Sequence, residues 1–417
     1  MKLTKLSLAA IVAAGALTSV ASAASLEEAI KNVEVTGYAR YRYDSKSNTA
    51  GRTGTTGFGE VVEANTVGSH RFTSDIDFKA ALDDRFFGVV GFRYDSLDYS
   101  GERSGAQTRV GVDDGGEDKF GQTFNVRQFY LGYTAGNTTI TAGRQVLGTF
   151  FTDDMVGTGI KLLNSDISGL TLAAIAFDNL QDDGDIGTHS LILNSSYIDS
   201  EFVYDRNLYG VAAIGSYDSV SFQLWYSALD SVAQLYAADV TVGANLGDVD
   251  LSLQAQAAGS SMLDNNAATG GLKPVALDDA TFLAVELGAK AFGFDGSVGY
   301  VNLNTQGDGI SLISFEDQGG FITAGEDLLD YTIFNYDANI YFVTAGYTFA
   351  DKVRVGADYV GARVEQMGNY ADAYEAVARV DYKYSKKLNF KAWYSYIDRD
   401  NTLKDDKHLR FEARYNF

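Results

Sequence analysis

Apolar and polar residues alternate along most of this chain, and the last ten residues show the pattern most clearly. From His408 to Phe417, apolar side chains occupy every second position and charged or amide side chains fill most of the others. A period of two is typical of a β-strand with one apolar face and one polar face. A soluble sandwich buries the apolar face, whereas a barrel in a bilayer turns it towards lipid and keeps the polar face in water. A terminal strand that ends on an aromatic residue favours the barrel for an exported chain.

The same alternation predicts eighteen strands, an even number that suits a closed barrel with both ends on one side. In residues 33–43, Tyr41 and Tyr43 fall on the lipid phase and Arg40 and Arg42 on the lumen phase. We expect strands over 33–43, 69–82, 86–95, 123–134, 137–144, 157–163, 170–178, 207–217, 220–229, 234–246, 249–259, 281–292, 294–304, 339–349, 353–364, 374–384, 388–397 and 408–417.

Short and long connections alternate between these strands. Very short ones include Asp83-Asp84 and Gly247-Asp248, whereas 96–122 and 305–338 are among the longest. Short periplasmic turns and longer outer loops are typical of transmembrane barrels. A propeller or a β-helix would show a fixed repeat instead, and we find none. The expected fold class is therefore all-β, an 18-stranded antiparallel transmembrane β-barrel.

The first 23 residues have the composition of a secretory signal peptide. Lys2 and Lys5 precede a short apolar run, and Ala21-Ser22-Ala23 forms the small-residue pattern of a cleavage site. A retained membrane helix needs roughly 20 apolar residues, which this run does not reach. We expect residues 1–23 to be a leader and residues 24–417 to be the barrel.

Composition and charge narrow the functional classes. The chain has 44 Gly, one Pro and no Cys, which suits a strand-rich fold held by backbone pairing and burial. Its net charge of −22 makes nucleic acid an improbable partner. Hydrolytic barrels need a nucleophile and a histidine. Of the three histidines, His70 and His408 begin strands and His189 lies in a connection without a Gly-x-Ser-x-Gly motif. We therefore expect no enzyme activity.

Several segments resemble a known family from end to end. They are the leader and then "LEEAIKNVEVTGYARYRYD", "VRQFYLGYT", "VGTGIKLLNSDISGLTLAAIAFD", "NLYGVAAIGSYD", "FEDQGG", "VRVGADYV" and "EAVARVDYKYSKKLNFKAWYSYID". They resemble the major outer membrane porin of Campylobacter and its epsilonproteobacterial relatives. The resemblance implies an 18-stranded barrel in the outer membrane and a homotrimer. It also implies general diffusion of ions and small hydrophilic solutes with some preference for cations, and a constriction that can hold a calcium ion.

A barrel of this size leaves a water-filled channel, so selectivity depends on what narrows it. In porins an inward-folded loop does so, and we expect that constriction loop at residues 145–156, with Asp153 and Asp154 adjacent in it. Acid on the loop and base on the facing wall would set up a transverse field. If another segment narrows the pore, 305–338 is the strongest alternative. The arginines expected at inward positions are Arg40, Arg42, Arg71, Arg127, Arg144, Arg354 and Arg379.

Calcium needs several hard oxygen ligands that converge on one point. The candidates that match the acidic loop positions of the family are Asp154, Asp185 and Glu316, with Asp153 nearly as good as Asp154. No EF-hand spacing is present, so the sequence alone supports this site weakly. A substrate-specific channel or a surface adhesin built on the same barrel remains the alternative function.

Overall fold

The computed structural model describes residues 33–48, 65–100, 124–181, 186, 206–263, 279–306, 319–329, 337–366, 369–400 and 405–417. The expected leader, residues 1–23, lies outside these residues. Among them, no helix is long and apolar enough to cross a membrane.

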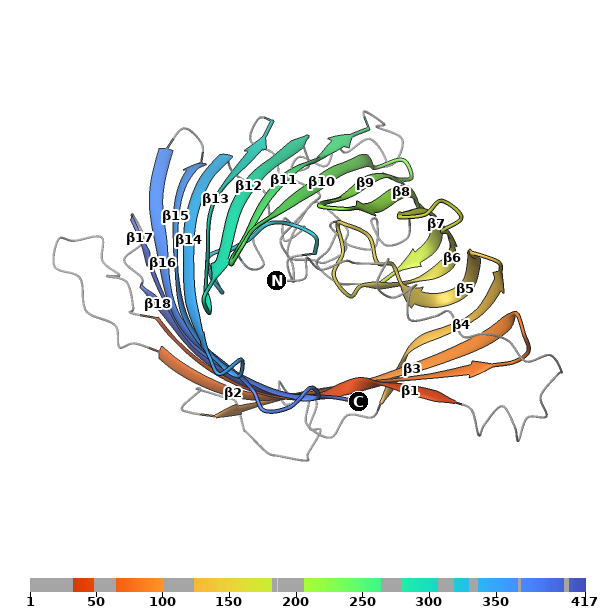
Figure 1. Cartoon of the computed structure of the whole chain (residues 1–417), viewed down its shortest axis with the longest axis horizontal. Helices are drawn as coiled ribbons and strands as arrows, with labels where there is room; N and C mark the ends of the chain where they lie inside the picture. The colour runs from red at the N-terminus through yellow and green to blue at the C-terminus, as the bar shows by residue number, and fades with distance from the viewer. Residues whose placement is uncertain are drawn as a thin grey trace, which may run out of the picture.

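Eighteen strands form one antiparallel sheet in which each strand pairs with its neighbours in the chain. β1 also pairs with β18 along the register from Tyr38 opposite Asn416 to Asn48 opposite Asp406, which closes the sheet into a barrel (Figure 1). The expected fold class and all eighteen expected strands are confirmed. The strands are β1 (Glu34–Asn48), β2 (Asn65–Ala81), β3 (Phe86–Ser100), β4 (Asn125–Ala135), β5 (Thr138–Val146), β6 (Val156–Asn164), β7 (Leu170–Leu180), β8 (Leu208–Tyr217), β9 (Val220–Leu229), β10 (Ala233–Leu246), β11 (Val249–Met262), β12 (Ala280–Ala291), β13 (Phe294–Thr305), β14 (Asp337–Phe349), β15 (Val353–Gln366), β16 (Asn369–Lys383), β17 (Leu388–Arg399) and β18 (Asp406–Asn416).

Tight turns connect neighbouring strands at one end of the barrel. Phe292 and Gly293 join β12 to β13, and both have positive φ, 51° and 83°. Two consecutive residues of positive φ are typical of a hairpin turn whose twist matches that of the strands. The connections at the opposite end are mostly longer, and those that lie wholly within the described residues include 147–155 between β5 and β6.

The outer surface carries an apolar belt. Leu253, Leu287, Val298 and Val343 are direct neighbours across β11 to β14, and their exposed fractions are 46%, 50%, 49% and 49%. A soluble protein would bury such a row, whereas a barrel presents it to hydrocarbon. Aromatic pairs flank the belt, such as Phe294 with Tyr347 beside a short turn and Tyr374 with Tyr396 nearer the long connections. These rings are placed as interfacial girdles.

The inner surface is divided into an apolar part and a charged part. On β16 the inward positions carry Glu375, Arg379 and Asp381, as the alternation predicts. On β7 to β15, by contrast, most inward positions near the long connections are apolar and buried, which the alternation did not anticipate. The largest of these side chains are Phe177, Trp225, Leu235, Phe282 and Phe342. They avoid water because two segments of the chain fold into the ring of strands and cover them (Figure 1).

The apolar belt predicts an asymmetric response to charge. Leu253→Arg places a guanidinium in the middle of the belt and should lower the free energy of unfolding in lipid by about 2–4 kcal/mol. Ser252→Arg, the neighbouring position on the lumen face, should change it far less. Urea-induced unfolding in vesicles measures both, and equal losses would contradict the assignment of the faces.

Candidate pore constriction

The segment 147–155 between β5 and β6 is folded into the barrel. The side chains of Leu147, Phe150 and Phe151 are at most 2% exposed. The amide of Leu147 donates to the carbonyl of Met155 at 2.9 Å, and the ammonium of Lys161 donates to the carbonyl of Val146 at 2.5 Å. These hydrogen bonds pair backbone groups at the point where the segment leaves β5 and returns to β6. The inward-folded loop expected at 145–156 is therefore present.

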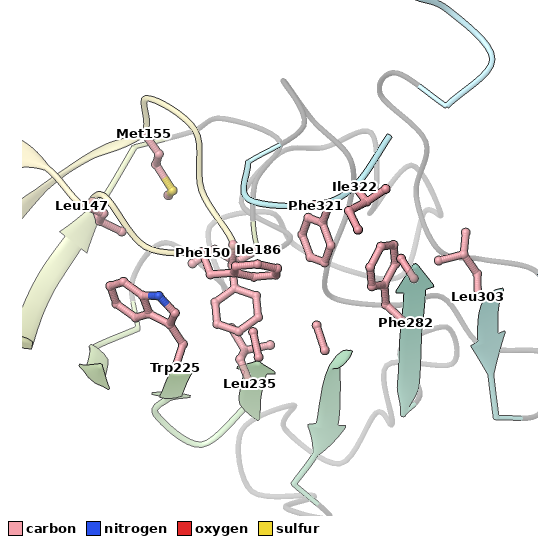
Figure 2. Packing of buried hydrophobic residues seen from close by; sticks show 14 of the residues in the cluster. Leu147, Phe150, Met155, Ile186, Trp225, Leu235, Phe282, Leu303, Phe321 and Ile322 are labelled. Carbon is pink, nitrogen blue, oxygen red and sulfur yellow. The ribbon is translucent and has the colours of Figure 1, made fainter. Parts of the chain in front are cut away.

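A second segment, 319–329, also lies inside the barrel and touches the first. The amide of Gly320 donates to the carbonyl of Phe150 at 2.9 Å. The rings of Phe150 and Phe321 meet edge to face at 4.8 Å, and Phe321 meets Phe282 of β12 at the same distance (Figure 2). A Cβ at Gly320 would lie 2.6 Å from the Phe150 ring, so this contact requires glycine. Residues 319–329 of the alternative segment 305–338 thus lie inside the barrel beside the expected loop.

The side chain of Gln256 on β11 holds this second segment to the wall. Its amide nitrogen donates to the carbonyl of Gly320 at 2.8 Å, and its oxygen accepts from the amide of Ile322 at 2.7 Å. A buried side chain that pairs with both backbone groups removes the cost of placing an irregular segment against an apolar wall.

Asp154 fastens the first segment to the neighbouring strands β3 and β4. Its carboxylate accepts from Arg93 of β3 at 2.6 Å and lies 2.9 Å from the guanidinium of Arg127 of β4. Asp75 of β2 accepts from both arginines as well, at 2.7 Å and 3.0 Å. Burial raises the pKa of the Asp154 carboxyl, but Arg127 and Arg93 outweigh it and hold that pKa below its usual value. Asp153 is exposed beside it.

Arg127 reaches the lumen because of a β-bulge. In the β3–β4 register Gly91 pairs with Gln128 and Phe92 with Val126, which leaves Arg127 as an extra residue between them. Without the bulge Arg127 would share the outward phase of Phe129, which is 63% exposed. Bulges commonly redirect a side chain near a functional site.

The other expected arginines fall into three groups. Arg40, Arg42, Arg71 and Arg379 face the lumen near the two inward segments. Among their carboxylate partners, Glu412 lies 3.0 Å from Arg42 and Asp95 lies 2.5 Å from Arg71. Arg40 lies 4.0 Å from the same Glu412, and Arg379 pairs with Glu326 of the second segment at 2.7 Å and with Asp358 of β15.

Arg354 also faces the lumen but lies near the opposite end of the barrel. It pairs with Asp295 at 2.6 Å beside the short turn that precedes β15. Four residues of strand, roughly 13 Å, separate it from the level of Asp358. Arg354 therefore lines the end of the barrel that carries the short turns and does not belong to the constriction.

The inward placement expected for Arg144 is wrong. Arg144 pairs with Phe129 on β4 and with Thr158 on β6, and both of these are exposed on the outer face. Directly opposed residues in antiparallel strands share a face, so Arg144 points outwards. It lies two residues from the end of β5, where a long side chain can extend towards the headgroups.

Several charged residues near the constriction were not singled out from the sequence. Arg93 is one, although it falls on the lumen phase of its expected strand, and counting that phase would have found it. A cavity of about 100 Å³ lies beside the second segment. Its lining is Arg42, Glu326, Arg379, Asp381, Lys391, Ala392, Trp393, Arg410 and Glu412.

The calcium site expected at Asp154, Asp185 and Glu316 stays a prediction. Asp185 and Glu316 lie outside the described residues. Asp154 fits a calcium ligand poorly, because its carboxylate is already shared by two guanidinium groups. Within the ranges that the structure describes, no three acidic or histidine side chains converge as a metal site would require.

Comparison with known proteins identifies the family of this chain and solved structures with a similar fold. The family model described as Campylobacter major outer membrane protein matches residues 1–417. Among solved structures, OccAB3 of Acinetobacter baumannii is similar with a TM-score of 0.66 at 12% identity, over 92% of this chain and all of that one. OpdK of Pseudomonas aeruginosa, crystallised with vanillate, has a TM-score of 0.64 at 13% identity, over 93% of this chain and 99% of its own. No curated protein sequence matches this chain. At such identities the solved structures support the fold alone.

The Asp154 contacts predict how acid and mutation act on the first segment. Because the folded-state pKa of Asp154 is lowered, its stabilisation is complete above the ordinary aspartate pKa of about 3.9 and is lost as pH falls through the lower folded value. Asp154→Asn should weaken the segment by about 1 kcal/mol at neutral pH, a value discounted for partial exposure. Hydrogen exchange of the 147–155 amides measures this. Asp153→Asn is the matched control, and equal exchange in both variants would contradict the role of Asp154.

Proposed function

The chain belongs to the Campylobacter major outer membrane protein family, and from this premise we propose that it is a general-diffusion channel. It is a multi-pass β-barrel porin of the outer membrane. We infer that ions and small hydrophilic solutes pass through it passively, along a water-filled path beside the two inward segments.

The observation that carries this proposal is the charged part of the inner wall. Side chains of Arg71, Asp95 and Asp154 keep exposed fractions of 40%, 34% and 40% although they point into the barrel. Charged groups are stable there because water reaches them. A lumen filled entirely with protein would leave such groups without hydration, so their exposure supports a continuous aqueous path.

The arrangement of charge around this path supports a selective constriction. Asp154 and Glu326 are contributed by the two inward segments, and Arg42 and Arg127 by the facing wall. Opposed rows of acid and base create a transverse field that orders water and orients polar solutes. Such a field favours small hydrophilic molecules over apolar ones.

We further propose a weak preference for cations. The full chain carries 55 acidic against 33 basic residues, and loss of a leader with Lys2 and Lys5 would make the balance more negative. A net negative protein raises the local concentration of cations at the mouth of its channel. The preference should shrink as salt rises, because charges beyond roughly 8–10 Å are screened near physiological ionic strength.

Reversal potentials in a salt gradient test the proposed constriction and the proposed preference for cations. The wild-type channel should show a reversal potential of cation sign at low salt. Asp153→Asn with Asp154→Asn should shift it towards anions, since two carboxylates are removed beside arginines in a narrow site. Asp83→Asn with Asp84→Asn is the matched control, because it removes the same charge from a tight turn at the other end. An equal shift in both pairs would contradict a constriction at Asp154, and a current that saturates with one solute would favour a substrate-specific channel.

We also propose that the protein is a homotrimer among the outer-membrane lipids. Its support is a row of outward residues across β8 to β11 that are mostly small. Ala213 pairs with Leu224, which pairs with Ala238, which pairs with Ala257. Small outward side chains allow close packing of one apolar surface against another in a bilayer.

Crosslinking in native membranes should trap a trimer. Ala238→Phe, which thickens this wall, should reduce the trimer band, whereas Val343→Phe on another wall should not. Migration of the unheated, crosslinked protein at monomer mass alone would contradict the proposal.

A further inference from the structure

His408 of β18 lies between two carboxylates that belong to different parts of the fold. Its Nε2 is 2.8 Å from Oδ1 of Asp44 on β1, and its Nδ1 is 2.7 Å from Oδ1 of Asp327 in the second inward segment. The side chain of His408 is 5% exposed. The row Asp44–His408–Asp327 therefore connects the wall of the barrel to the segment that narrows it.

Two hydrogen bonds from His408, one to each carboxylate, require one proton more than a neutral imidazole between two ionised carboxylates provides. A neutral imidazole has one N–H, so it donates to only one of two ionised carboxylates. Asp44 also accepts from Arg410 at 2.5 Å, which favours its ionised form. Both short contacts then exist only if His408 is protonated or if Asp327 holds the proton. Loss of that proton removes one hydrogen bond and leaves a lone pair facing a carboxylate.

Other groups around His408 set the conditions for this change. Trp393 of β17 packs edge to face on the imidazole at 4.5 Å, and Ser395 of the same strand is its direct cross-strand neighbour. Lys46 of β1 pairs with His408 in the β1–β18 register and, with Arg410 of β18, supplies positive charge on this face. Oδ2 of Asp327 is buried without a hydrogen-bond partner among the described residues, so its attachment to the wall depends on His408.

A second anchor on the same segment does not depend on His408. The buried carboxylate of Glu375 on β16 accepts from the amides of Glu326, Asp327 and Leu328 at 3.0, 3.0 and 3.1 Å. It also accepts from the hydroxyl of Ser395 at 2.6 Å. Loss of the His408 contact therefore loosens the segment and does not expel it.

We propose that His408 is a proton-controlled latch on the second inward segment, so that the constriction is held rigidly at low pH and loosens as pH rises. The opposite sign holds for the other segment, where the Asp154 contacts fail only in strong acid. The two segments should therefore respond to pH independently of each other.

Two substitutions should act in opposite directions. Asp327→Asn offers an amide that can donate to Nδ1 while Nε2–H donates to Asp44, so a neutral imidazole satisfies both contacts and the latch stays closed at all pH values. His408→Asn cannot span both carboxylates and should leave the latch open at all pH values. His70→Asn is the control, because it removes an outward histidine that contacts Tyr41 and lies away from the second segment. This variant should keep the pH dependence of the wild-type protein.

Open-channel current noise and tryptophan fluorescence give independent readouts. In planar bilayers, the ratio of loose to latched states should rise on the order of ten-fold across the transition, as for loss of a charge-assisted hydrogen bond. The chain has two tryptophans. In Trp225→Phe protein, the fluorescence of Trp393 should be quenched while His408 is protonated and should increase at the same pH as the noise.

The conductance readout rests on the proposed channel function, whereas the fluorescence readout does not. Coincident transitions in the wild type, with none of the noise transition left in Asp327→Asn, would support the latch. A full noise transition in Asp327→Asn, or a fluorescence transition at a different pH, would overturn it. If the protein does not conduct, hydrogen exchange of the 319–329 amides replaces the noise. Exchange independent of pH, after correction for its intrinsic pH dependence, would then overturn the latch.

Discussion

The closed backbone ladder is the constraint on which the rest of this structure depends. A hydrocarbon layer offers no hydrogen-bond partners, so a sheet can cross it only if no edge remains. Pairing of β1 with β18 from Tyr38–Asn416 to Asn48–Asp406 removes both edges at once. Once the ladder is closed, outward side chains need only be apolar. Inward side chains are then free to carry chemistry, because they contribute little to holding the wall together.

The chemical character of the inward side chains differs around the lumen. Along β7 to β15 the inward positions build an apolar cluster with Phe150 and Phe321 of the two inward segments. Burial of these rings offsets the cost of ordering two irregular segments inside a barrel. Along β1 to β4 and β16 to β18 many inward positions are charged, and some of these side chains are partly exposed. The proposed aqueous path therefore lies to one side of the barrel.

A carboxylate fastens each inward segment to the wall. In the first segment that carboxylate belongs to the segment, whereas in the second it belongs to the wall. In the first segment, Asp154 of the loop accepts from Arg93 and Arg127 of the wall. In the second, Glu375 of the wall accepts from backbone amides of the loop. The first arrangement places negative charge at the constriction beside the arginines, whereas the second buries it in the wall. Under the proposed channel function, Asp154 can therefore act on both ion passage and the position of its segment, whereas Glu375 acts on position alone.

The sequence by itself determined the barrel, its eighteen strands and an inward loop at 145–156, because a period of two and alternating connection lengths are local signals that closure does not change. It also placed Asp154 and most of the inward arginines, since strand phase assigns a face. Tertiary structure decided the rest. Arg127 reaches the lumen only through a bulge, and Arg144 points outwards because the register with Phe129 sets its phase. The contacts of residues 319–329 with Gln256, Glu375 and His408 join positions up to 81 residues apart. No periodicity encodes such pairings, because they arise only when the closed wall brings distant strands around a common interior.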